Sequence, residues 1–369
     1  MRKGWEYKRL DECANIEYGT RVVQKKDSGT LYPVYGGGGE TFRMDKFNRE
    51  DCLIVARFAM SRRCVRFVNG KFFLNDSGLS VKAGDKLYQS YLNYNIISLN
   101  DDIYHLGKGA AQRNLDVKSF KKLTIAIPPQ STQLAIVSEL DKINELIRLK
   151  KEQLKDFDNL AQSLFYEMFG DPVENEKGWE VKKLGEIGEF KNGLNFSKDE
   201  NGHSIKFLGV SDFQNKKSIA SDQLAYISLS ERVQEDYLLK TGDIVFVRSN
   251  GKKELIGRSV KMYITEPTTY SGFCIRCRIT DEKVDKDYIA ILLKTPIIRQ
   301  FMTNSGRGCN ISNLNQKVLN SIPTILPPLS LQRLFAQRIE QIEREKSEVQ
   351  KSIQGLETLL ASRMQYWFE

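Results

Sequence analysis

The stretch Ser131–Phe169, STQLAIVSELDKINELIRLKKEQLKDFDNLAQSLFYEMF, decides how this chain folds, and a stretch of equal length, Ser330–Phe368, closes the sequence. Each stretch has 39 residues without a proline, so each is predicted to form one helix. At about 1.5 Å per residue, such a helix is roughly 58 Å long, more than a compact domain needs to cover its own core. We therefore expect both helices to act as spacers.

Apolar residues recur in both stretches at alternating steps of three and four positions, which is the pattern of a coiled-coil seam. Lys150 interrupts the first seam, and Lys346 and Arg363 interrupt the second. Seams of equal length, joined through a globular segment, predict antiparallel pairing of the two helices. The alternative is two unrelated amphipathic helices, each packed on its own domain. The seam positions are Leu140, Ile143, Ile147, Leu154, Phe157, Ile339, Ile342, Val349, Ile353 and Leu356.

Composition places the chain among globular proteins. With 369 residues, of which 40% are hydrophobic, it can form two or three packed domains. No stretch reaches the ~18 consecutive apolar residues of a membrane span, and no apolar run follows the first charged residues. We therefore expect a cytoplasmic protein that does not enter a membrane, with its six cysteines reduced.

Positive charge is concentrated in the parts of the chain outside the long helices. Residues 1–130 carry 22 Lys and Arg against 14 Asp and Glu, and residues 171–329 carry 23 against 20. The two helical segments are close to neutral, with 5 basic against 7 acidic residues in 131–170 and 6 against 6 in 330–369. This distribution suggests a polyanion that is contacted at two places.

An internal duplication relates the two halves of the chain. Gly4-Trp5-Glu6 opens the first half and Gly178-Trp179-Glu180 opens the second. A period near half the chain length indicates two domains rather than a solenoid. The later matched segments are 53–57 with 244–248, 77–79 with 271–273, 107–109 with 306–308, 114–118 with 313–317, and the diprolines 128–129 with 327–328.

The repeat predicts an α+β fold with an internal pseudo-twofold relation. Two similar globular domains, residues 1–130 and 171–329, are each built from mixed β-sheet and short helices. Two long antiparallel helices, 131–170 and 330–369, separate these domains. Within the domains, residues 89–97 and 287–299 are predicted helical, and Asn114 and Asn313 are predicted N-caps of one short helix each.

Together these features resemble the DNA-specificity subunit of type I restriction-modification systems. The resemblance rests on the repeated Gly-Trp-Glu, the Gly-x-Gly followed by Asn-Leu, the diproline followed by Gln, and the two long helices. It implies two target recognition domains, each reading one half of a bipartite, asymmetric site in double-stranded DNA. It also implies two modification (methyltransferase) subunits and restriction/translocase subunits as partners. S-adenosylmethionine, ATP and Mg²⁺ would belong to those partners, and this chain would hold no cofactor.

Catalytic signatures are sparse in this sequence, so no catalytic residue and no metal ligand is predicted. Asp171 with Glu180 and Lys182 resembles the acids and lysine of a metal-dependent nuclease, but the repeated segment has no matching upstream acid. Cys274 and Cys277 lack a second pair, and their odd separation places them on opposite faces of a strand. A stand-alone DNA endonuclease and a coiled-coil adaptor that binds no nucleic acid remain alternative functions.

Basic and glycine-rich loops are the candidate DNA contacts. Arginine can hold guanine O6 and N7 through two hydrogen bonds, and asparagine can do the same at adenine. Glycine lets backbone N–H groups approach phosphate. The alternative is that these residues are solvated charged turns. The predicted DNA-binding residues are Arg57, Arg62, Arg63, Arg66, Gly37, Gly38, Lys108, Arg248, Asn250, Lys252, Lys253, Arg258 and Arg307.

Three apolar positions lie off the seam in each helix and match between the two copies. They need another surface to cover them, which could be the recognition domains or a partner subunit. Because they occur twice, they suit two copies of one partner. The predicted partner-binding residues are Leu160, Phe165, Phe169, Leu359, Met364 and Phe368.

Overall fold

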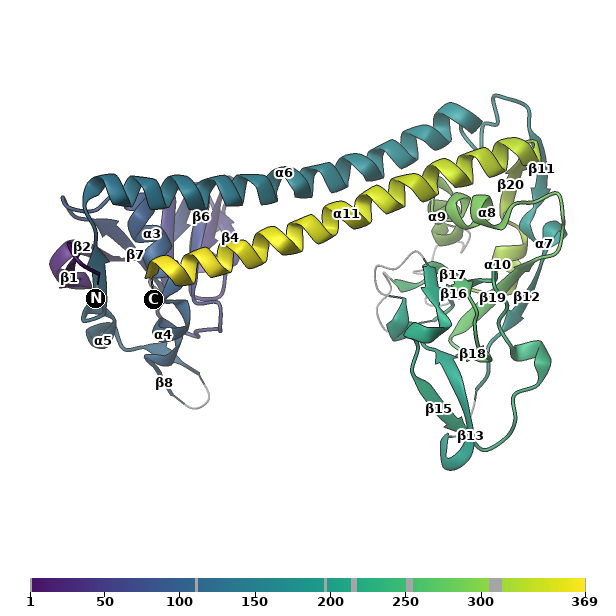
Figure 1. Ribbon diagram of the computed structural model, residues 1–369, viewed down its shortest axis with the longest axis horizontal. Coiled ribbons are helices and arrows are strands. Elements are labelled where there is room, and N and C mark those ends of the chain that lie inside the picture. Colours follow the sequence, from purple (N-terminus) through teal and green to yellow (C-terminus); the bar gives the residue numbers. More distant parts are fainter. Residues whose placement is uncertain are drawn as a thin grey trace. The chain divides into compact units, whose positions relative to one another are not determined.

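The computed structural model of the chain describes residues 2–109, 112–195, 198–213, 218–249, 255–304 and 314–368. The chain divides into two compact units, shown as a ribbon in Figure 1. Unit 1 comprises Met1–Gln153 and Val349–Glu369, and unit 2 comprises Leu154–Glu348. Both long helices therefore contribute residues to each unit.

The two long helices are confirmed. α6 (Gln130–Phe169) and α11 (Leu329–Phe368) each have 40 residues and begin within two residues of a diproline. The first helical amides bond back to the second proline, with Gln133 N donating to Pro129 O and Gln332 N to Pro328 O. A proline fixes the backbone just before each helix, which explains why the two helices start at matching points.

In each unit the two helices pair in antiparallel orientation. In unit 1, Glu139 of α6 accepts from Arg363 and Trp367 of α11, whereas Lys151, further along α6, pairs with Glu357. In unit 2, Asp158 pairs with Lys346, and Phe165 and Phe169 stack against Phe335. Partner numbers fall as α6 numbers rise, which is the signature of antiparallel pairing.

The seam residues occupy the interior of these pairings. Leu154, Phe157 and Leu356 are half-buried. The polar seam residue Lys346 is neutralised by Asp158, and Arg363 by Glu139, so both are accommodated without an unpaired charge. The buried members are Leu140, Ile143, Ile147, Ile339, Ile342, Val349 and Ile353.

Unit 1 is built on a six-stranded sheet with the order β2-β7-β5-β6-β3-β4. All its pairings are antiparallel except that of β3 with β6. A separate ribbon of β1 and β10 leads into α6. The strands are β1 (Glu6–Arg9), β2 (Ala14–Tyr18), β3 (Tyr32–Tyr35), β4 (Glu40–Met44), β5 (Arg49–Ala56), β6 (Val65–Leu74), β7 (Gly78–Ala83), β8 (Gly107–Lys108), β9 (Asn114–Leu115) and β10 (Thr124–Ile127). The short helices are α1 (Leu10–Cys13), α2 (Gln24–Asp27), α3 (Gln89–Ser98), α4 (Asn100–His105) and α5 (Val117–Lys121).

Unit 2 repeats the centre of this sheet, with the order β12-β19-β16-β17-β14. It adds a second sheet of three strands, β15-β13-β18, and a ribbon of β11 and β20. The strands are β11 (Glu180–Lys183), β12 (Gly188–Asn192), β13 (Lys198–Leu208), β14 (Ser218–Ala220), β15 (Tyr226–Leu229), β16 (Ile244–Val247), β17 (Ser259–Tyr263), β18 (Thr268–Tyr270), β19 (Cys274–Ile279) and β20 (Pro323–Leu326). The helices are α7 (Leu184–Ile187), α8 (Lys286–Leu292), α9 (Pro296–Asn304) and α10 (Gln316–Asn320), with three-residue 3₁₀ turns at Val210–Asp212, Ser221–Gln223 and Glu235–Tyr237.

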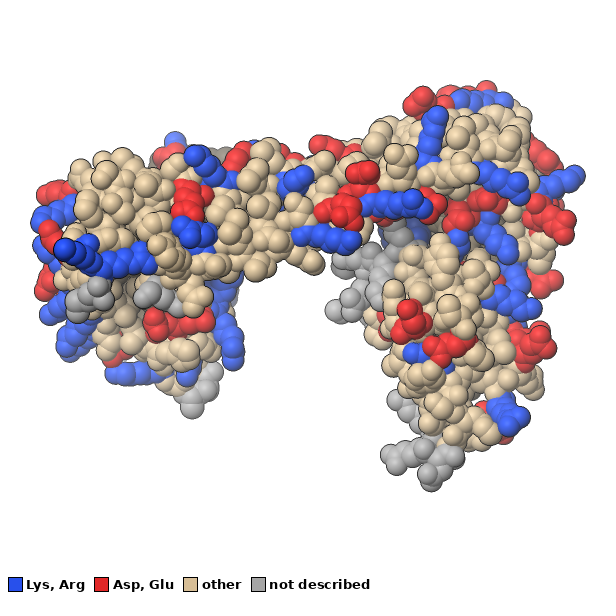
Figure 2. Space-filling view, in the orientation of Figure 1, with Lys and Arg blue, Asp and Glu red and all other residues tan. Residues whose placement is uncertain are grey.

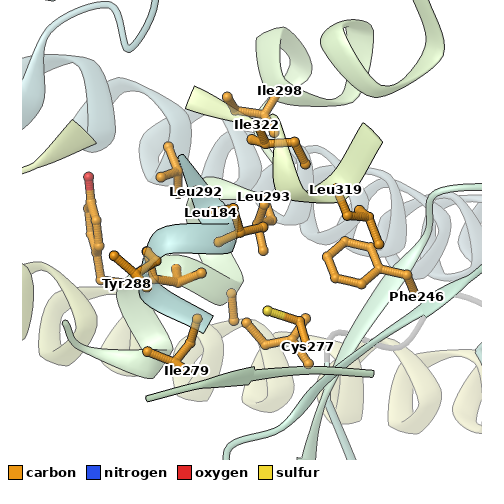
Figure 3. Packing of buried hydrophobic residues seen from close by; sticks show 14 of the residues in the cluster. Leu184, Phe246, Cys277, Ile279, Tyr288, Leu292, Leu293, Ile298, Leu319 and Ile322 are labelled. Atoms are coloured by element: carbon orange, nitrogen blue, oxygen red, sulfur yellow. The ribbon is translucent and has the colours of Figure 1, made fainter. Parts of the chain in front are cut away.

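The main core of unit 2 lies between its sheet and its helices. Figure 3 shows Phe246 and Cys277 from the sheet packing with Leu184, Tyr288 and Leu319. The hydroxyl of Tyr288 donates to Ile325 O at 3.0 Å, and in unit 1 the matching hydroxyl of Tyr91 donates to Ala126 O at 2.9 Å. The duplication is therefore preserved down to one tyrosine hydrogen bond in each unit.

The structure corrects three local predictions. The N-caps of the two short helices are Asp116 and Asn315, because their carboxylate and amide oxygens accept the first helical amides; Asn114 lies in β9 and Asn313 lies outside the described residues. Residues 287–299 form two helices, since the residue before Pro296 disfavours helical geometry. The matched segments 77–79 and 271–273 are offset, because Gly78 faces Ala56 whereas Cys274 faces Val247.

Four of the six predicted partner-binding residues are used inside the units. Phe165 and Phe169 are buried in the core of unit 2, so the prediction that they bind a partner is wrong. Met364 and Phe368 pack against the core of unit 1, where the Phe368 ring lies 5.6 Å from that of Tyr91. The globular parts of the two units thus cover these positions.

Membrane crossing requires a long apolar helix. Neither 40-residue helix, nor any other helix in the described ranges, is apolar enough to span a bilayer.

Candidate nucleic-acid interface

In unit 1, several loops meet where the central strands end. We call residues 19–23, 36–39, 57–64 and 75–77 the loop edge of unit 1. Backbone hydrogen bonds tie these loops together, from Thr20 N to Leu74 O at 2.9 Å and from Asn75 N to Tyr35 O at 2.9 Å. Because β3 and β6 run parallel, the loops that follow these two strands leave the sheet side by side, although they are distant in sequence.

Arg57 follows the last residue of β5 and has its backbone fixed on both sides. Its N–H donates to Ser77 O, and its carbonyl accepts from Leu115 N, both at 2.8 Å. Its guanidinium carbon lies 4.4 Å from the Phe58 ring centre and 5.1 Å from that of Tyr18. These cation–π contacts orient the guanidinium.

The Arg57 guanidinium keeps most of its hydrogen-bonding capacity. Nη1 donates to Asp76 O at 3.3 Å. Within the described part of the chain, Nε and Nη2 have no hydrogen-bond partner. A half-buried, oriented arginine with free donors can bind a base edge or a phosphate.

The glycine-rich loop between β3 and β4 is a packing element of this edge. A Cβ added to Gly37 would lie 2.1 Å from Phe58 O, and Gly39 has a φ of +126°, which favours glycine. Gly38 is exposed, and a Cβ added to it would meet nothing within 4 Å, so this position is open to a ligand. Gly37 is buried, and its predicted role as a DNA contact is corrected to that of holding the loop against Phe58.

The other predicted basic residues of unit 1 differ in exposure and in whether they already bond to another part of the chain. Arg62 and Arg63 are exposed on the loop between β5 and β6. Arg66 is half-buried and donates to Gly37 O at 3.3 Å and to Arg63 O at 3.1 Å, so it positions these loops. Lys108 is exposed but pairs with Asp116, and this hydrogen bond lowers the pKa of the Asp116 carboxyl to about 2.

Unit 2 repeats the backbone of this edge. Arg248 N donates to Phe273 O at 2.8 Å, and Arg248 O accepts from Leu314 N at 2.8 Å, matching Arg57 with Ser77 and Leu115. Arg248 and Arg258 are half-buried. We call residues 193–195, 248–249 and 271–273 the loop edge of unit 2. The predicted contacts Asn250, Lys252, Lys253 and Arg307 lie outside the described residues.

Charge alone does not mark these edges. In Figure 2, basic and acidic side chains are interspersed on the visible face of each unit. Some unit 2 cations are already paired inside the fold, such as Arg278 with Asp243 and Lys261 with Asp287. Loop position therefore discriminates candidate contacts better than charge alone.

Several edge residues were not predicted from the sequence. Tyr18 and Phe58 flank Arg57. Arg113 O accepts from Met60 N of the loop after β5 at 2.9 Å, and Arg113 Nη1 donates to Tyr104 O at 3.1 Å. Phe273 was matched to the core residue Leu79, and only the register of β19 shows that it corresponds to Ser77. An alignment of the two repeats by their strand pairing, rather than by residue identity, reveals this correspondence.

The alternative chemistry receives little support from the described residues. The Asp171 carboxylate accepts from Val173 N and Glu174 N, and Lys182 pairs with Asp281 and Glu180. Cys274 and Cys277 are buried in different clusters, as their opposite orientation predicts, and burial raises the pKa of the Cys274 thiol to about 12. Within the described ranges, His, Cys, Asp and Glu form no group able to hold a metal.

Comparison with known proteins agrees with the duplicated edge. The family described as "Type I restriction modification DNA specificity domain" matches residues 2–156 and again 176–357. The StySPI specificity subunit of Salmonella potsdam is 24% identical over 71% of this chain and 60% of its own length, and the EcoKI specificity subunit of Escherichia coli is 24% identical over 68% and 57%. The chain thus spans about 60% of the length of these two relatives.

Solved structures share the fold at low identity. The S subunit of a type I restriction-modification system from M. genitalium has a TM-score of 0.57 at 18% identity, with 98% of this chain and 95% of that chain covered. A chain from a study of assembly and conformational transition of the type I R-M system has a TM-score of 0.62 at 17% identity, with coverages of 100% and 98%. Two family matches that follow the internal repeat, on this fold, show that the chain belongs to the family of type I restriction-modification DNA specificity proteins.

Proposed function

We propose that this chain is the DNA-recognition subunit of a type I restriction-modification complex and binds a specific sequence in double-stranded DNA. The observation that carries the proposal is that one loop edge is built twice, with an arginine fixed by the same backbone hydrogen bonds in each unit. Two arginines at matching places, on units whose surrounding loops differ, suit a bipartite site with unlike halves.

The chemistry of the complex belongs to other subunits in this proposal. The chain itself is a non-catalytic, cytoplasmic component without a cofactor. S-adenosylmethionine, ATP and Mg²⁺ act in the modification and restriction/translocase partners. What supports this division is that the acids and thiols suspected from the sequence are engaged in turns, ion pairs or core packing.

Two exposed leucines at matching helix positions are the proposed docking points for two modification subunits. Leu160 in unit 2 is 50% exposed, and Leu359 in unit 1 is 46% exposed. Leu160 borders a shallow groove of about 310 Å³ that Phe157, Leu164 and Ile342 also line. Identical positions in a duplicated chain favour two copies of the same partner.

The first test is equilibrium binding of the chain, with its modification partner, to DNA that carries the target found by methylation profiling. If about four phosphates are contacted, affinity should fall roughly 100-fold between about 50 and 200 mM salt. Arg57→Ala and Arg248→Ala should each weaken specific binding by about tenfold or more, equivalent to about 1–3 kcal/mol. Arg344→Ala is the matched control, because Arg344 is exposed on α11 and pairs with Glu340 one turn away on the same helix.

Other outcomes would decide between the proposal and its alternatives. Cleavage of DNA by the purified chain with Mg²⁺, without partners, would favour the stand-alone endonuclease. A complex that binds no DNA would favour the coiled-coil adaptor. Binding with a flat salt dependence would contradict phosphate contacts.

A further inference from the structure

The two loop edges hold their arginines by the same backbone hydrogen bonds, but the side chains at the two neighbouring positions are exchanged between the units. In unit 1, Arg57 is followed by Phe58 and faces Ser77; in unit 2, Arg248 is followed by Ser249 and faces Phe273. The backbone hydrogen bonds match in the two units, because the amide after each arginine also donates to the carbonyl that the arginine amide contacts. Phe58 N lies 3.4 Å from Ser77 O, and Ser249 N lies 3.4 Å from Phe273 O. Each edge thus pairs one arginine with one phenylalanine, supplied from opposite sides.

The two phenylalanines are used differently. Phe58 is half-buried and packs on the Arg57 guanidinium. Phe273 is 60% exposed, and its ring has no aromatic or cation partner among the described residues. A large apolar side chain left in water at a site next to an arginine has contact area available for a ligand.

The backbone around Phe273 is fixed by hydrogen bonds. Its N–H donates to Ser271 Oγ at 3.2 Å, and the flanking amides of Gly272 and Cys274 donate to Leu194 O at 2.7 Å and Ser271 O at 2.8 Å. A Cβ on Gly272 would lie 2.1 Å from Asn195 Oδ1, so the turn is closely packed. The backbone is therefore fixed while the ring projects, which lowers the entropy lost when it binds.

We propose that Phe273 determines specificity in the half-site read by unit 2, by packing against the C5-methyl group of a thymine. The inference rests on the proposed function, since it concerns the same surface. In the major groove the thymine methyl is the apolar group that a phenylalanine can recognise, and the neighbouring arginine is suited to guanine. Insertion of the ring between bases is the competing mode, and it would be insensitive to a methyl group.

The test uses the full chain with its modification partner and duplexes in which single thymines of the target are replaced by deoxyuridine. Deoxyuridine pairs like thymine and lacks only the methyl group. For the wild-type chain, one replacement in one half-site should lower affinity about fourfold, the effect of one buried methyl group. For Phe273→Ser, which installs the residue found at the matching position of unit 1, the same replacement should have no effect.

Two further variants complete the design. Phe273→Leu keeps a smaller apolar side chain and should retain part of the sensitivity to deoxyuridine. Val181→Ser removes another exposed apolar side chain of unit 2, on β11, and should behave like the wild type. Because Phe273 is exposed, circular dichroism of the variants should match that of the wild type.

The inference is overturned if no thymine position is sensitive in the wild type, or if Phe273→Ser binds all duplexes more weakly with the sensitivity unchanged. These results are distinct from failure of the proposed function, in which the wild-type complex would show no sequence-specific binding at all.

Discussion

Single buried side chains perform the same task in both units, and two glutamines show this most clearly. Gln133 accepts from Tyr88 N and donates to Lys86 O and Pro128 O, each at 2.9 Å. Gln332 accepts from Asp285 N at 2.9 Å and donates to Pro327 O at 2.7 Å. Each side-chain amide joins the start of a long helix to the diproline and to the loop that precedes α3 in unit 1 or α8 in unit 2. When such a buried side-chain amide is removed, the backbone groups that it bonded to lose their hydrogen-bond partner.

Replacing either glutamine by leucine should therefore destabilise its own unit. We expect Gln133→Leu and Gln332→Leu each to lower the free energy of unfolding by about 2–4 kcal/mol, because buried backbone groups lose their hydrogen bonds. Urea titration followed by circular dichroism measures this loss. Gln162→Leu, at an exposed position of α6, is the control and should change stability by less than about 0.5 kcal/mol. Equal stability of the buried and exposed variants would contradict the assignment.

At the scale of elements, polar residues in the seam fix how α6 and α11 pair. In unit 1, Arg363 occupies a seam position and donates to Glu139, and Trp367 Nε1 donates to the same carboxylate at 2.9 Å. These bonds hold the pKa of Glu139 below its ordinary value of 4.5, mainly through the hydrogen bond from Arg363. In unit 2, Lys346 pairs with Asp158. Lys346 and Arg363 are thus each matched to an acid of the other helix, which opposes shifts of register, whereas Lys150 bonds to Gln153 within α6.

The lowered pKa of Glu139 makes the helix pairing depend on pH. A carboxyl whose pKa is lower in the folded chain stabilises it above the unfolded value of 4.5, and this contribution is lost as the pH falls through the folded pKa. Glu139→Gln should therefore unfold more easily than the wild type near neutral pH, and the difference should shrink below 4.5. Thermal unfolding at a series of pH values measures it. Glu167→Gln, at an exposed position, serves as the control.

The sequence predicted the elements with strong periodicity and missed what depends on tertiary contacts. Leu140 and Ile339 were placed in the seam because a regular pattern of 39 residues has few alternatives. Phe165 and Phe169 have the same apolar character whether a domain or a partner covers them, so only the structure assigns them to the core. Phe273 was misaligned because the loops before β7 and β19 contain similar residues at shifted positions.

The candidate site could be predicted only in part. Arg57 and Arg248 stand out because each directly follows a β-rich run. Their partners Tyr18 and Ser77, or Phe273, come from other loops, and no local pattern connects them. Arg66 donates to Gly37 O and Lys108 pairs with Asp116, and neither interaction could be inferred without the folded geometry.

At the scale of the whole molecule, the units cannot be separated by cutting the chain at the ends of the helices. Unit 1 includes Val349–Glu369, and its core is contacted by Leu360, Met364, Trp367 and Phe368. Unit 2 includes Leu154–Glu348 and buries Phe165 and Phe169 from α6. Each half of the duplication is therefore completed by helix residues from the other half of the sequence.

Because the chain passes between the units only within α6 and α11, these helices are expected to set the gap between the two DNA half-sites. Deletion of residues 148–154 together with 349–355 removes one heptad from each helix and keeps the seam in phase. Seven residues correspond to about 10 Å of helix, or about three base pairs of DNA at 3.4 Å each. We expect the modification complex carrying this variant to methylate the same two half-sites at a gap shorter by about three base pairs. Methylation profiling of a host that carries it reads the gap directly. Deleting only one of the two heptads is the control, since it breaks the pairing and should abolish specific methylation. An unchanged gap in the double deletion would show that the helices do not set the spacing.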